Sequence, residues 1–336
     1  QRCALMGKNP KIAVLGGGSW ATAIVKMLTQ NEEYVGWWVR REEVAAHIRQ
    51  FHHNPNYLSD VALETDKIYV DHDLMSVASQ AEILVLAVPS AFLAESIEPL
   101  RELLPQKWVI SAVKGIEPGS HQIIGEYLHD NIGLEYSRFG AIVGPCHAEE
   151  IALERLSYLT VASENEKLSN IVADKLRGSY VKVRCTTDIY GTEYAAVLKN
   201  IYAIAAGLAQ GLGYGDNFQA VLVSNALREM KRVIGAVHPI KRQIIQTEYS
   251  GDLFVTMYSP FSRNRRLGLL LGKGYSLSAA RAEMSMIAEG YYAAKLIREV
   301  KREREVKMPI ALAVYKVLYE NASPKKTLRA LAEKLK

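Results

Sequence analysis

The chain has 336 residues, of which 49% are hydrophobic and 23% are charged. This length predicts two domains, and the composition is ordinary for a globular protein with a sizeable core. The 41 Lys and Arg residues barely outnumber the 36 Asp and Glu residues. Such an excess is too small to indicate a nucleic-acid-binding protein, although it suits an anionic small ligand. The three cysteines, Cys3, Cys146 and Cys185, are too few and too scattered for a disulfide framework or a zinc ribbon, so a reducing cytoplasm is the expected location.

The N-terminal residues carry no targeting signal that the sequence reveals. Residues 1–10 lack the continuous apolar run of a signal peptide, and Met6 is a candidate natural start, with residues 1–5 upstream of it. The one long uncharged run, residues 200–215, contains Asn200, Gln210 and several glycines. It predicts a buried helix and loop rather than a membrane span.

The first half of the chain alternates short β-rich runs with amphipathic helical segments such as 21–31 and 42–50. This alternation predicts crossover units and a parallel sheet, with ligands bound at the carboxyl ends of the strands. The strands are expected at residues 11–15, 34–39, 67–70, 83–88, 108–113, 139–143, 157–162 and 180–184.

The first expected strand runs directly into the pattern Gly16-x-Gly18-x-x-Ala21, which is followed by helix-forming residues. Gly16 permits a tight turn, Gly18 lets the backbone approach a pyrophosphate, and Ala21 keeps the helix close to the sheet. The free N–H groups at the helix start then face the phosphates. In this strand–turn–helix context the pattern predicts dinucleotide binding, with a merely tight turn as the alternative.

The end of the second strand bears on which dinucleotide is bound. An Asp or Glu there would bind the ribose 2′-hydroxyl of NAD, but this chain has Arg40 and Arg41. Two guanidinium groups suit a 2′-phosphate, so NADP(H) is the preferred cofactor and NAD(H) remains possible. In the alternative, Arg40 stacks on the adenine while Glu42 or Glu43 reaches the ribose.

The sequence pattern changes near residue 190. Long helical runs follow at 192–210, 217–237, 276–300 and 309–320, with little β pattern. We therefore predict an α/β domain over residues 1–190 and an all-α domain over residues 191–336. The mixed-sign charges of residues 298–307 are typical of a solvated helix face.

Lys199 is the only charged residue between Tyr194 and Gly215. Burial of such a lysine lowers its pKa, because it disfavours the ammonium form, and suits it to proton transfer during carbonyl reduction. The alternative is a lysine that extends from the helix end to the surface. Asn200 beside it and the glycine-rich stretch that ends at 215–217 favour the functional reading.

Three further stretches carry an unusual density of polar residues. Lys114 and Glu117 follow the strand at 108–113, where ligands bind. Residues 262–266 combine serine, asparagine and arginines at a predicted helix start, which suits a phosphate, although such a run is also common on surfaces. Cys146 and His147 are adjacent, but neighbouring residues rarely converge as a metal pair or as a nucleophile with its base, so we expect neither arrangement and no metal.

Seven segments in this order resemble the bacterial NAD(P)-dependent sn-glycerol-3-phosphate dehydrogenase family, over nearly the whole chain from Lys11 to about residue 300. Seven ordered motifs are far more specific than a glycine turn alone. The segments are Gly16–Ala21, Val113–Glu117, Gly144–Glu150, Leu198–Asn200, Gly211–Asn217, Gly251–Leu253 and Ser262–Arg265.

The resemblance implies a Rossmann-type N-terminal domain, a helical substrate-binding domain and an active site between them. It implies an oxidoreductase that reversibly reduces dihydroxyacetone phosphate to sn-glycerol 3-phosphate, a precursor in phospholipid biosynthesis and lipid metabolism. Family members are often dimers, so a homodimer is possible, and no nucleic acid or membrane span is expected.

The resemblance also implies roles for individual residues. Lys199 is the proton donor and acceptor, and Lys114 touches both substrate and cofactor. The other residues implied at the substrate are Gly144, Cys146, Asp252, Ser262, Arg263 and Asn264. Those implied at the cofactor are Gly16, Gly18, Ser19, Trp20, Arg40, Arg41, Ala148, Arg263, Ile287 and Glu289.

Three positions depart from the family pattern. At one of them Met257 and Tyr258 follow Thr256 where a cysteine is frequent, a change expected to alter packing only. Cys146 stands where serine or threonine is common, which puts its side-chain contact in doubt, and Ala21 replaces a common glycine. Two rival functions stay open. Related two-domain reductases act on 6-phosphogluconate, β-hydroxyacids or ketopantoate, and a nucleotide-sensing module would bind the cofactor without turnover.

Overall fold

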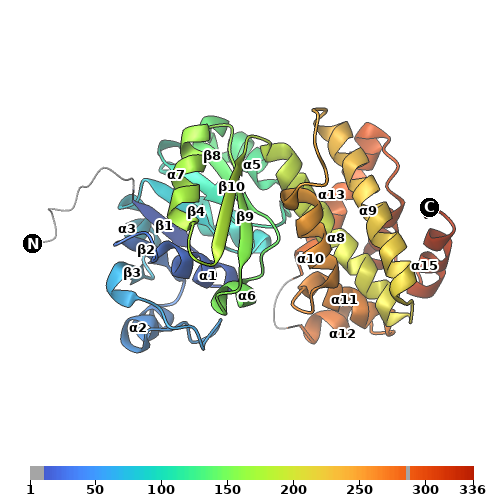
Figure 1. The fold of residues 1–336 in the computed structure, drawn as a ribbon, viewed down its shortest axis with the longest axis horizontal. Helices are drawn as coiled ribbons and strands as arrows, with labels where there is room; N and C mark the ends of the chain where they lie inside the picture. The colour runs from blue at the N-terminus through green and yellow to red at the C-terminus, as the bar shows by residue number, and fades with distance from the viewer. Residues whose placement is uncertain (1–10, 285–287) are drawn as a thin grey trace, which may run out of the picture.

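The computed structural model describes residues 11–284 and 288–336. Residues 1–10, with Cys3 and Met6, and the expected cofactor residue Ile287 lie outside the described residues. Figure 1 shows two parts side by side, a sheet flanked by helices and an array of helices that ends at the C-terminus. Within the described ranges, no helix combines the length and apolarity needed to cross a membrane.

The eight predicted strands form one sheet in the order β10-β9-β8-β5-β4-β1-β2-β3. All four residues of β1 and β4 are buried, as expected for strands covered on both faces. Because β1 lies between β2 and β4, the chain reverses its direction of strand addition there, which is where such sheets bind ligands. The bounds are β1 Ile12–Leu15, β2 Val35–Trp38, β3 Ile68–Asp71, β4 Ile83–Leu86, β5 Trp108–Ser111, β8 Phe139–Val143, β9 Ser157–Ala162 and β10 Val181–Thr186.

The expectation of an all-parallel sheet is wrong at one pair. Strands β8 and β9 are antiparallel, with Ala141 opposite Ala162. The link between them contains only the short helix α6 (Ala148–Ala152), and the chain returns along the neighbouring strand instead of crossing over the sheet. A two-stranded hairpin, β6 (Ile116–Glu117) with β7 (Gln122–Ile123), was not predicted.

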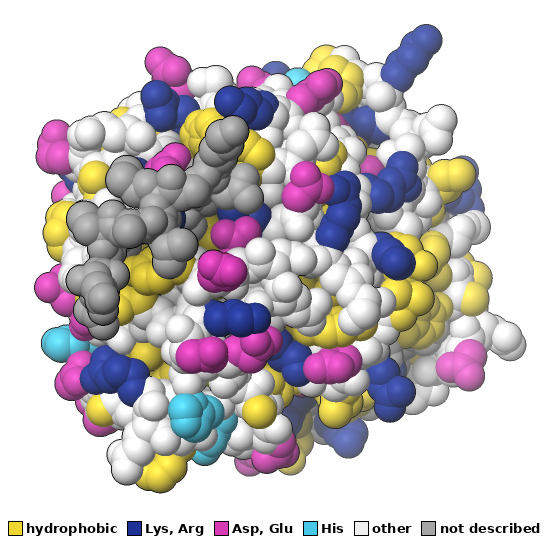
Figure 2. Space-filling view, turned by 60° about the vertical axis from the view of Figure 1, so that its left-hand side comes forward, with side chains coloured by type: hydrophobic (Ala, Val, Ile, Leu, Met, Phe, Trp, Pro, Cys, Tyr) yellow, Lys and Arg dark blue, Asp and Glu magenta, His cyan; other side chains and the backbone are white. Residues whose placement is uncertain are grey.

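Helices cover both faces of the sheet and enclose two hydrophobic clusters. One cluster includes the fully buried Trp37 and the other Phe139. The helices are α1 Ser19–Leu28, α2 Glu42–Phe51, α3 Leu74–Ser79, α4 Leu93–Ile97, α5 Ile124–Tyr127 and α7 Glu166–Leu176. Figure 2 shows one face of the molecule with basic and acidic side chains interspersed, in keeping with the small net charge.

The second part is built around α8 (Ile189–Gly211), a helix of 23 residues that is buried along most of its length. It packs closely on α11 (Arg263–Gly272) because glycines face each other. A Cβ at Gly207 would lie 2.0 Å from the carbonyl oxygen of Arg265, and one at Gly268 would lie 2.0 Å from that of Ile204. This approach fixes the start of α11 beside the middle of α8.

The single helix expected at 276–300 is two helices, α12 (Leu277–Ala282) and α13 (Glu289–Arg304). The second helix begins where it docks on α8, since a Cβ at Gly290 would lie 2.7 Å from the carbonyl oxygen of Asn200. The remaining helices are α9 Asp216–Val237, α10 Asp252–Tyr258, α14 Pro309–Tyr319 and α15 Pro324–Ala332.

Candidate active site

A pocket of about 160 Å³ lies between the two parts of the molecule. One wall comes from the carboxyl ends of β1, β4, β5 and β8, and the other from α8, α10, α11 and the first residue of α13. The expected site residues that line it are Gly18, Ser19, Trp20, Lys114, Cys146, Ala148, Lys199, Asp252, Ser262, Arg263, Asn264 and Glu289.

The turn after β1 forms a cradle at the start of α1. Gly16 has φ +141°, and a Cβ there would lie 2.3 Å from the carbonyl oxygen of Ala87, so the turn requires glycine. Gly16 itself lies outside the pocket lining and shapes the turn. Around Gly18, the N-cap of α1, nothing lies within 4 Å of where a Cβ would be.

The start of α1 has the electrostatics expected of a phosphate site. Its first turn contains no acidic residue, and no side chain caps its free N–H groups. The buried indole Nε1 of Trp20 also has no hydrogen-bond partner among the described residues. The unobstructed glycine, the uncapped helix and the unpaired donor fit a dinucleotide pyrophosphate.

Arg40 and Arg41 lie outside this pocket, at the exposed start of α2. Arg41 pairs with Glu43, with 3.3 Å between Nε and Oε1, whereas Arg40 forms no ion pair with a described residue. Glu42 pairs with Arg49, with 2.6 Å between Nη2 and Oε1. Both carboxylates proposed to reach a ribose therefore already hold basic partners.

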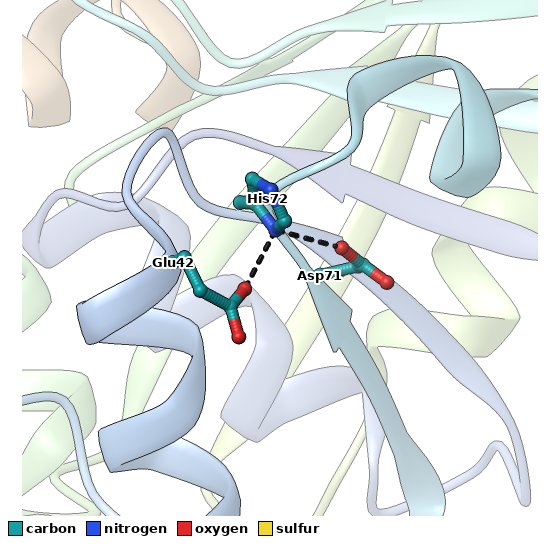
Figure 3. Close-up of side chains that lie close together, drawn as sticks. All are labelled: Glu42, Asp71 and His72. Atoms are coloured by element: carbon teal, nitrogen blue, oxygen red, sulfur yellow. Dashed lines mark ion pairs between the residues drawn. The ribbon is translucent and has the colours of Figure 1, made fainter.

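Glu42 also belongs to an exposed cluster with Asp71 and His72, shown in Figure 3. His72 Nδ1 lies 2.6 Å from Glu42 Oε2 and 3.2 Å from Asp71 Oδ1. The two carboxylates already bind this one imidazole, and nothing else points to a cation there.

Lys199 is 3% exposed and pairs with Asp252, whose Oδ1 lies 2.5 Å from Nζ. The alternative of a lysine that reaches the surface is therefore wrong. Burial lowers the pKa of Lys199 to about 8, the negative charge of Asp252 opposes this shift, and the positive charge of Lys114 adds to it. Lys199 thus holds a proton at neutral pH and releases it far more readily than an exposed lysine.

Lys114 faces Lys199 from the sheet side of the pocket. Its Nζ donates to the carbonyl oxygen of Cys146 at 3.2 Å and lies 4.7 Å from the ring centre of Trp20. The amide of Asn200 donates to the carbonyl oxygen of Lys114 at 2.5 Å. The helix that carries Lys199 therefore also fixes the backbone of Lys114.

The start of α11 supplies the third group of polar atoms. Ser262 is the N-cap, and its hydroxyl accepts from the N–H of Arg265 at 3.3 Å. Arg263 lines the pocket but is otherwise exposed. Asn264 is buried, donates to Asn200 Oδ1 at 2.9 Å and accepts from the N–H of Gly290 at 2.8 Å, so it joins α11 to α8 and α13.

Glu289 is the first residue of α13, and its carboxylate contacts Ser90 in the other part of the molecule. It accepts hydrogen bonds from the N–H of Ser90, at 3.0 Å, and from the Ser90 hydroxyl. Burial raises its pKa, and the hydrogen bonds from Ser90 oppose that shift. Since a Cβ at Gly115 would lie 2.5 Å from Glu289 Oε2, the carboxylate also packs against the turn after Lys114.

The loop after β8 carries no activated nucleophile. Burial raises the pKa of Cys146 to about 12, so it stays a thiol at neutral pH. Burial, helped by the charges of Lys114 and Lys199, lowers the pKa of His147 to about 4. Gly144 lies outside the pocket lining and makes the turn with φ +120°.

Part of the pocket lining was not among the expected site residues. Ser90 was missed because its partner Glu289 lies 199 residues away. The others lie within or just after expected strands, within the segments that carry the family resemblance, or within four residues of expected site residues, so a local signal was available for each. They are Ala87, Val88, Pro89, Ala112, Val113, His147, Glu149, Asn200, Val255, Thr256 and Phe261.

Family models and sequence relatives identify the family to which this chain belongs. Residues 11–169 match the family described as "NAD-dependent glycerol-3-phosphate dehydrogenase N-terminus", and residues 188–329 match the corresponding C-terminus. A Salinibacter ruber protein, "Glycerol-3-phosphate dehydrogenase [NAD(P)+] 2", is 37% identical over 320 residues, covering 94% of this chain and 92% of that protein. A Staphylococcus aureus "Glycerol-3-phosphate dehydrogenase [NAD(P)+]" is 33% identical over 96% of this chain and 98% of its own length.

The fold agrees with these matches. The crystal structure of glycerol-3-phosphate dehydrogenase from Coxiella burnetii superposes with a TM-score of 0.89 at 26% identity. The superposition covers 97% of this chain and 99% of that one. The likeness therefore extends over both parts of the molecule and the pocket between them.

Proposed function

The chain belongs to the NAD-dependent glycerol-3-phosphate dehydrogenase family and is an NAD(P)-dependent oxidoreductase, and we propose that the pocket between its two parts carries out the reaction with Lys199 as the proton donor and acceptor. The reaction is the reversible interconversion of dihydroxyacetone phosphate and sn-glycerol 3-phosphate. The observation that carries the proposal is the buried ammonium of Lys199, which shares one pocket with the uncapped start of α1.

The proton step follows from the Lys199 environment. A bound reduced nicotinamide supplies the hydride to the carbonyl carbon. Lys199 donates a proton to the carbonyl oxygen as negative charge grows there, and it accepts that proton in the reverse direction. Asp252 keeps the ammonium in place, and Lys114 adds a second positive charge near the oxygen.

The substrate phosphate requires fixed positive charge and N–H donors. Both are available where Arg263 begins α11, because the helix dipole and the guanidinium act on the same side of the pocket. Asn264 and Ser262 shape this end through their hydrogen bonds. The family membership favours this phosphate substrate over the carboxylates of related two-domain reductases.

A substrate panel tests the function. Purified protein is assayed with dihydroxyacetone phosphate, ketopantoate and 6-phosphogluconate, each with NADPH and with NADH, by following absorbance at about 340 nm. We expect kcat/KM for dihydroxyacetone phosphate to exceed the others by at least about 10²-fold. A preference for a carboxylate substrate contradicts the proposal, and cofactor binding without any turnover indicates a sensing module.

We further propose that NADPH is preferred over NADH. The support is the free guanidinium of Arg40 at the end of β2, while Glu42 and Glu43 hold other basic partners. Arg40→Glu should raise KM for NADPH by about 10²-fold and leave KM for NADH within about threefold, because an ion pair with the 2′-phosphate is lost. Steady-state kinetics with each cofactor measures this, and equal changes for both cofactors contradict it.

The domain boundary and the cellular setting are also proposals. We place the boundary near residue 190, where α8 begins, and the enzyme in the cytoplasm, since Cys146 and Cys185 are free thiols. The product is expected to feed phospholipid biosynthesis. Light scattering on the purified chain tests the homodimer that the family resemblance implies.

A further inference from the structure

Three buried side chains hold the carbonyl oxygens of the glycine turn, residues 16–18. In the order of the carbonyls that they bind, the donors are the Trp37 indole at 2.7 Å, the Asn54 amide at 3.0 Å and the Thr22 hydroxyl at 3.0 Å. All three side chains are fully buried. Each carbonyl of the turn therefore has a side-chain donor inside the protein.

These hydrogen bonds also set the direction of the N–H groups in the turn. A carbonyl oxygen and the N–H of the next residue belong to one planar trans peptide and point in opposite directions. No described residue accepts from the N–H of Gly17 or Gly18, and a Cβ at Gly18 would meet nothing within 4 Å. Successive N–H groups that face open space at a helix start form an anion site.

Asn54 lies outside the strand–turn–helix unit, in the loop after α2, and all its hydrogen-bonding capacity is used. Nδ2 donates to the carbonyl oxygen of Gly17 and, at 2.9 Å, to Thr22 Oγ1. Oδ1 accepts from the N–H groups of Asn56 at 3.0 Å and Tyr57 at 3.3 Å. Because a carbonyl oxygen only accepts and a backbone N–H only donates, a reversed amide would lose three of these four contacts.

The contact with Thr22 extends this control to the next carbonyl. The Thr22 hydroxyl has a single proton, and it accepts from Asn54 while it donates to the carbonyl oxygen of Gly18. One amide therefore holds Gly17 directly and Gly18 through Thr22.

We propose that Asn54 is a positioning residue for the cofactor, because it keeps the N–H groups of the glycine turn directed at the pyrophosphate. Donors that are already ordered bind a ligand more tightly, since the cost of ordering them does not fall on binding. Asn54 does not line the pocket and acts only through the turn. The inference rests on the proposed function and deepens it, because it adds a residue that the glycine pattern does not contain.

Asn54→Asp is the sharpest test. Aspartate has the same shape and still accepts from Asn56 and Tyr57, but it places a carboxylate oxygen against the carbonyl of Gly17. We expect the Kd for NADPH, measured by fluorescence titration, to rise about 10- to 100-fold. In steady-state kinetics, kcat at saturating NADPH and KM for dihydroxyacetone phosphate should stay within about threefold.

Asn56→Asp is the matched control for the added charge. Its side chain is exposed, it lies two residues away in the same loop, and its backbone N–H is unchanged by the substitution. The Kd for NADPH should stay within about twofold of wild type.

An uncharged pair of variants tests the same link. Thr22→Val keeps the shape but removes the hydroxyl, so the Kd for NADPH should rise about 3- to 10-fold. Thr22→Ser retains the hydroxyl and should stay within about twofold of wild type. This pair decides the question if Asn54→Asp does not fold.

The titration requires no turnover, so failure of the positioning role is distinct from failure of the proposed reaction. Wild-type protein that binds NADPH but does not reduce dihydroxyacetone phosphate contradicts the reaction, and the variants still decide the role of Asn54. An unchanged Kd in Asn54→Asp, or a rise no larger than in Asn56→Asp, overturns that role. Losses in kcat and in KM for dihydroxyacetone phosphate as large as the loss in NADPH affinity also overturn it, because they indicate general disruption of the fold.

Discussion

Two buried charged residues of α8, Asp188 at its N-cap and Lys199 in its middle, both form ion pairs but serve different purposes. Asp188 caps the start of the helix and accepts hydrogen bonds from Arg242, at 2.5 Å and 2.8 Å, from the Tyr249 hydroxyl at 2.5 Å and from the N–H of Gly191 at 3.0 Å. Lys199, three turns later, has Asp252 as its one hydrogen-bond partner within the described part of the chain. Asp188 is saturated, whereas Lys199 keeps donor capacity for a ligand.

The two centres also differ in how burial affects protonation. Burial alone would raise the pKa of Asp188, but the hydrogen bonds from Arg242, Tyr249 and Gly191 outweigh it and lower the pKa. At Lys199, burial outweighs Asp252 and brings the pKa to about 8. A fully paired charge therefore stays fixed and stabilises the fold, whereas an incompletely paired one can exchange a proton.

Substitution of Asp188, whose carboxylate has several hydrogen-bond partners, should lower the free energy of unfolding more than the other substitutions. Asp188→Ala leaves the Arg242 guanidinium buried and unpaired, so the free energy of unfolding should fall by about 3–5 kcal/mol. Urea denaturation measures this, and kcat of the folded variant should stay within about threefold. The double variant Asp188→Leu with Arg242→Met should recover part of the stability. A collapse of kcat comparable to that expected at Lys199 would show that Asp188 serves the reaction directly.

Substitution of Lys199, which has one hydrogen-bond partner among the described residues, should lower turnover rather than stability. Lys199→Ala removes the proposed proton donor, so kcat should fall by at least about 10²–10³-fold, while the Kd for NADPH stays within about twofold. Stopped-flow reduction and fluorescence titration measure the two quantities. Lys231→Ala, at an exposed site on α9, is the matched control and should leave both unchanged. Turnover of the Lys199 variant within tenfold of wild type rejects the assignment.

A smaller effect should follow when the partner of Lys199 is altered. Asp252 raises the pKa of Lys199 against burial. Asp252→Asn removes that charge, so the alkaline limit of the reduction should move down by about 1 pH unit or more, and turnover at pH 7 should fall severalfold. A pH profile of kcat/KM for the variant beside wild type measures the shift. An unchanged alkaline limit would mean that Asp252 does not tune Lys199.

The sequence was informative where a local pattern has a direct physical meaning. The eight strands, the turn at Gly16 and the isolated position of Lys199 were all predictable, because burial and close backbone approach leave local signatures. The antiparallel β8–β9 pair and the break before Glu289 were not, since tertiary packing decides them.

The same limit applies to long-range side-chain pairs, in the site and outside it. The pairing of Asp188 with Arg242 joins residues 54 positions apart, and that of Ser90 with Glu289 spans 199 positions. Neither distance leaves a trace in a single sequence. Single residues such as Lys199 and Asp252 were therefore predictable, whereas the pairing of residues far apart in the chain required coordinates.

The pH dependence of wild-type protein in both reaction directions tests the central claim most directly. In the proposed mechanism reduction requires protonated Lys199, so kcat/KM for reduction should be level below a pH of about 8 and fall tenfold per pH unit above it. Oxidation of sn-glycerol 3-phosphate requires the neutral amine, so its kcat/KM should rise up to the same pH and then level off. Profiles that are flat from pH 7 to 9, or that bend only near the ordinary lysine value of about 10.4, would contradict the account.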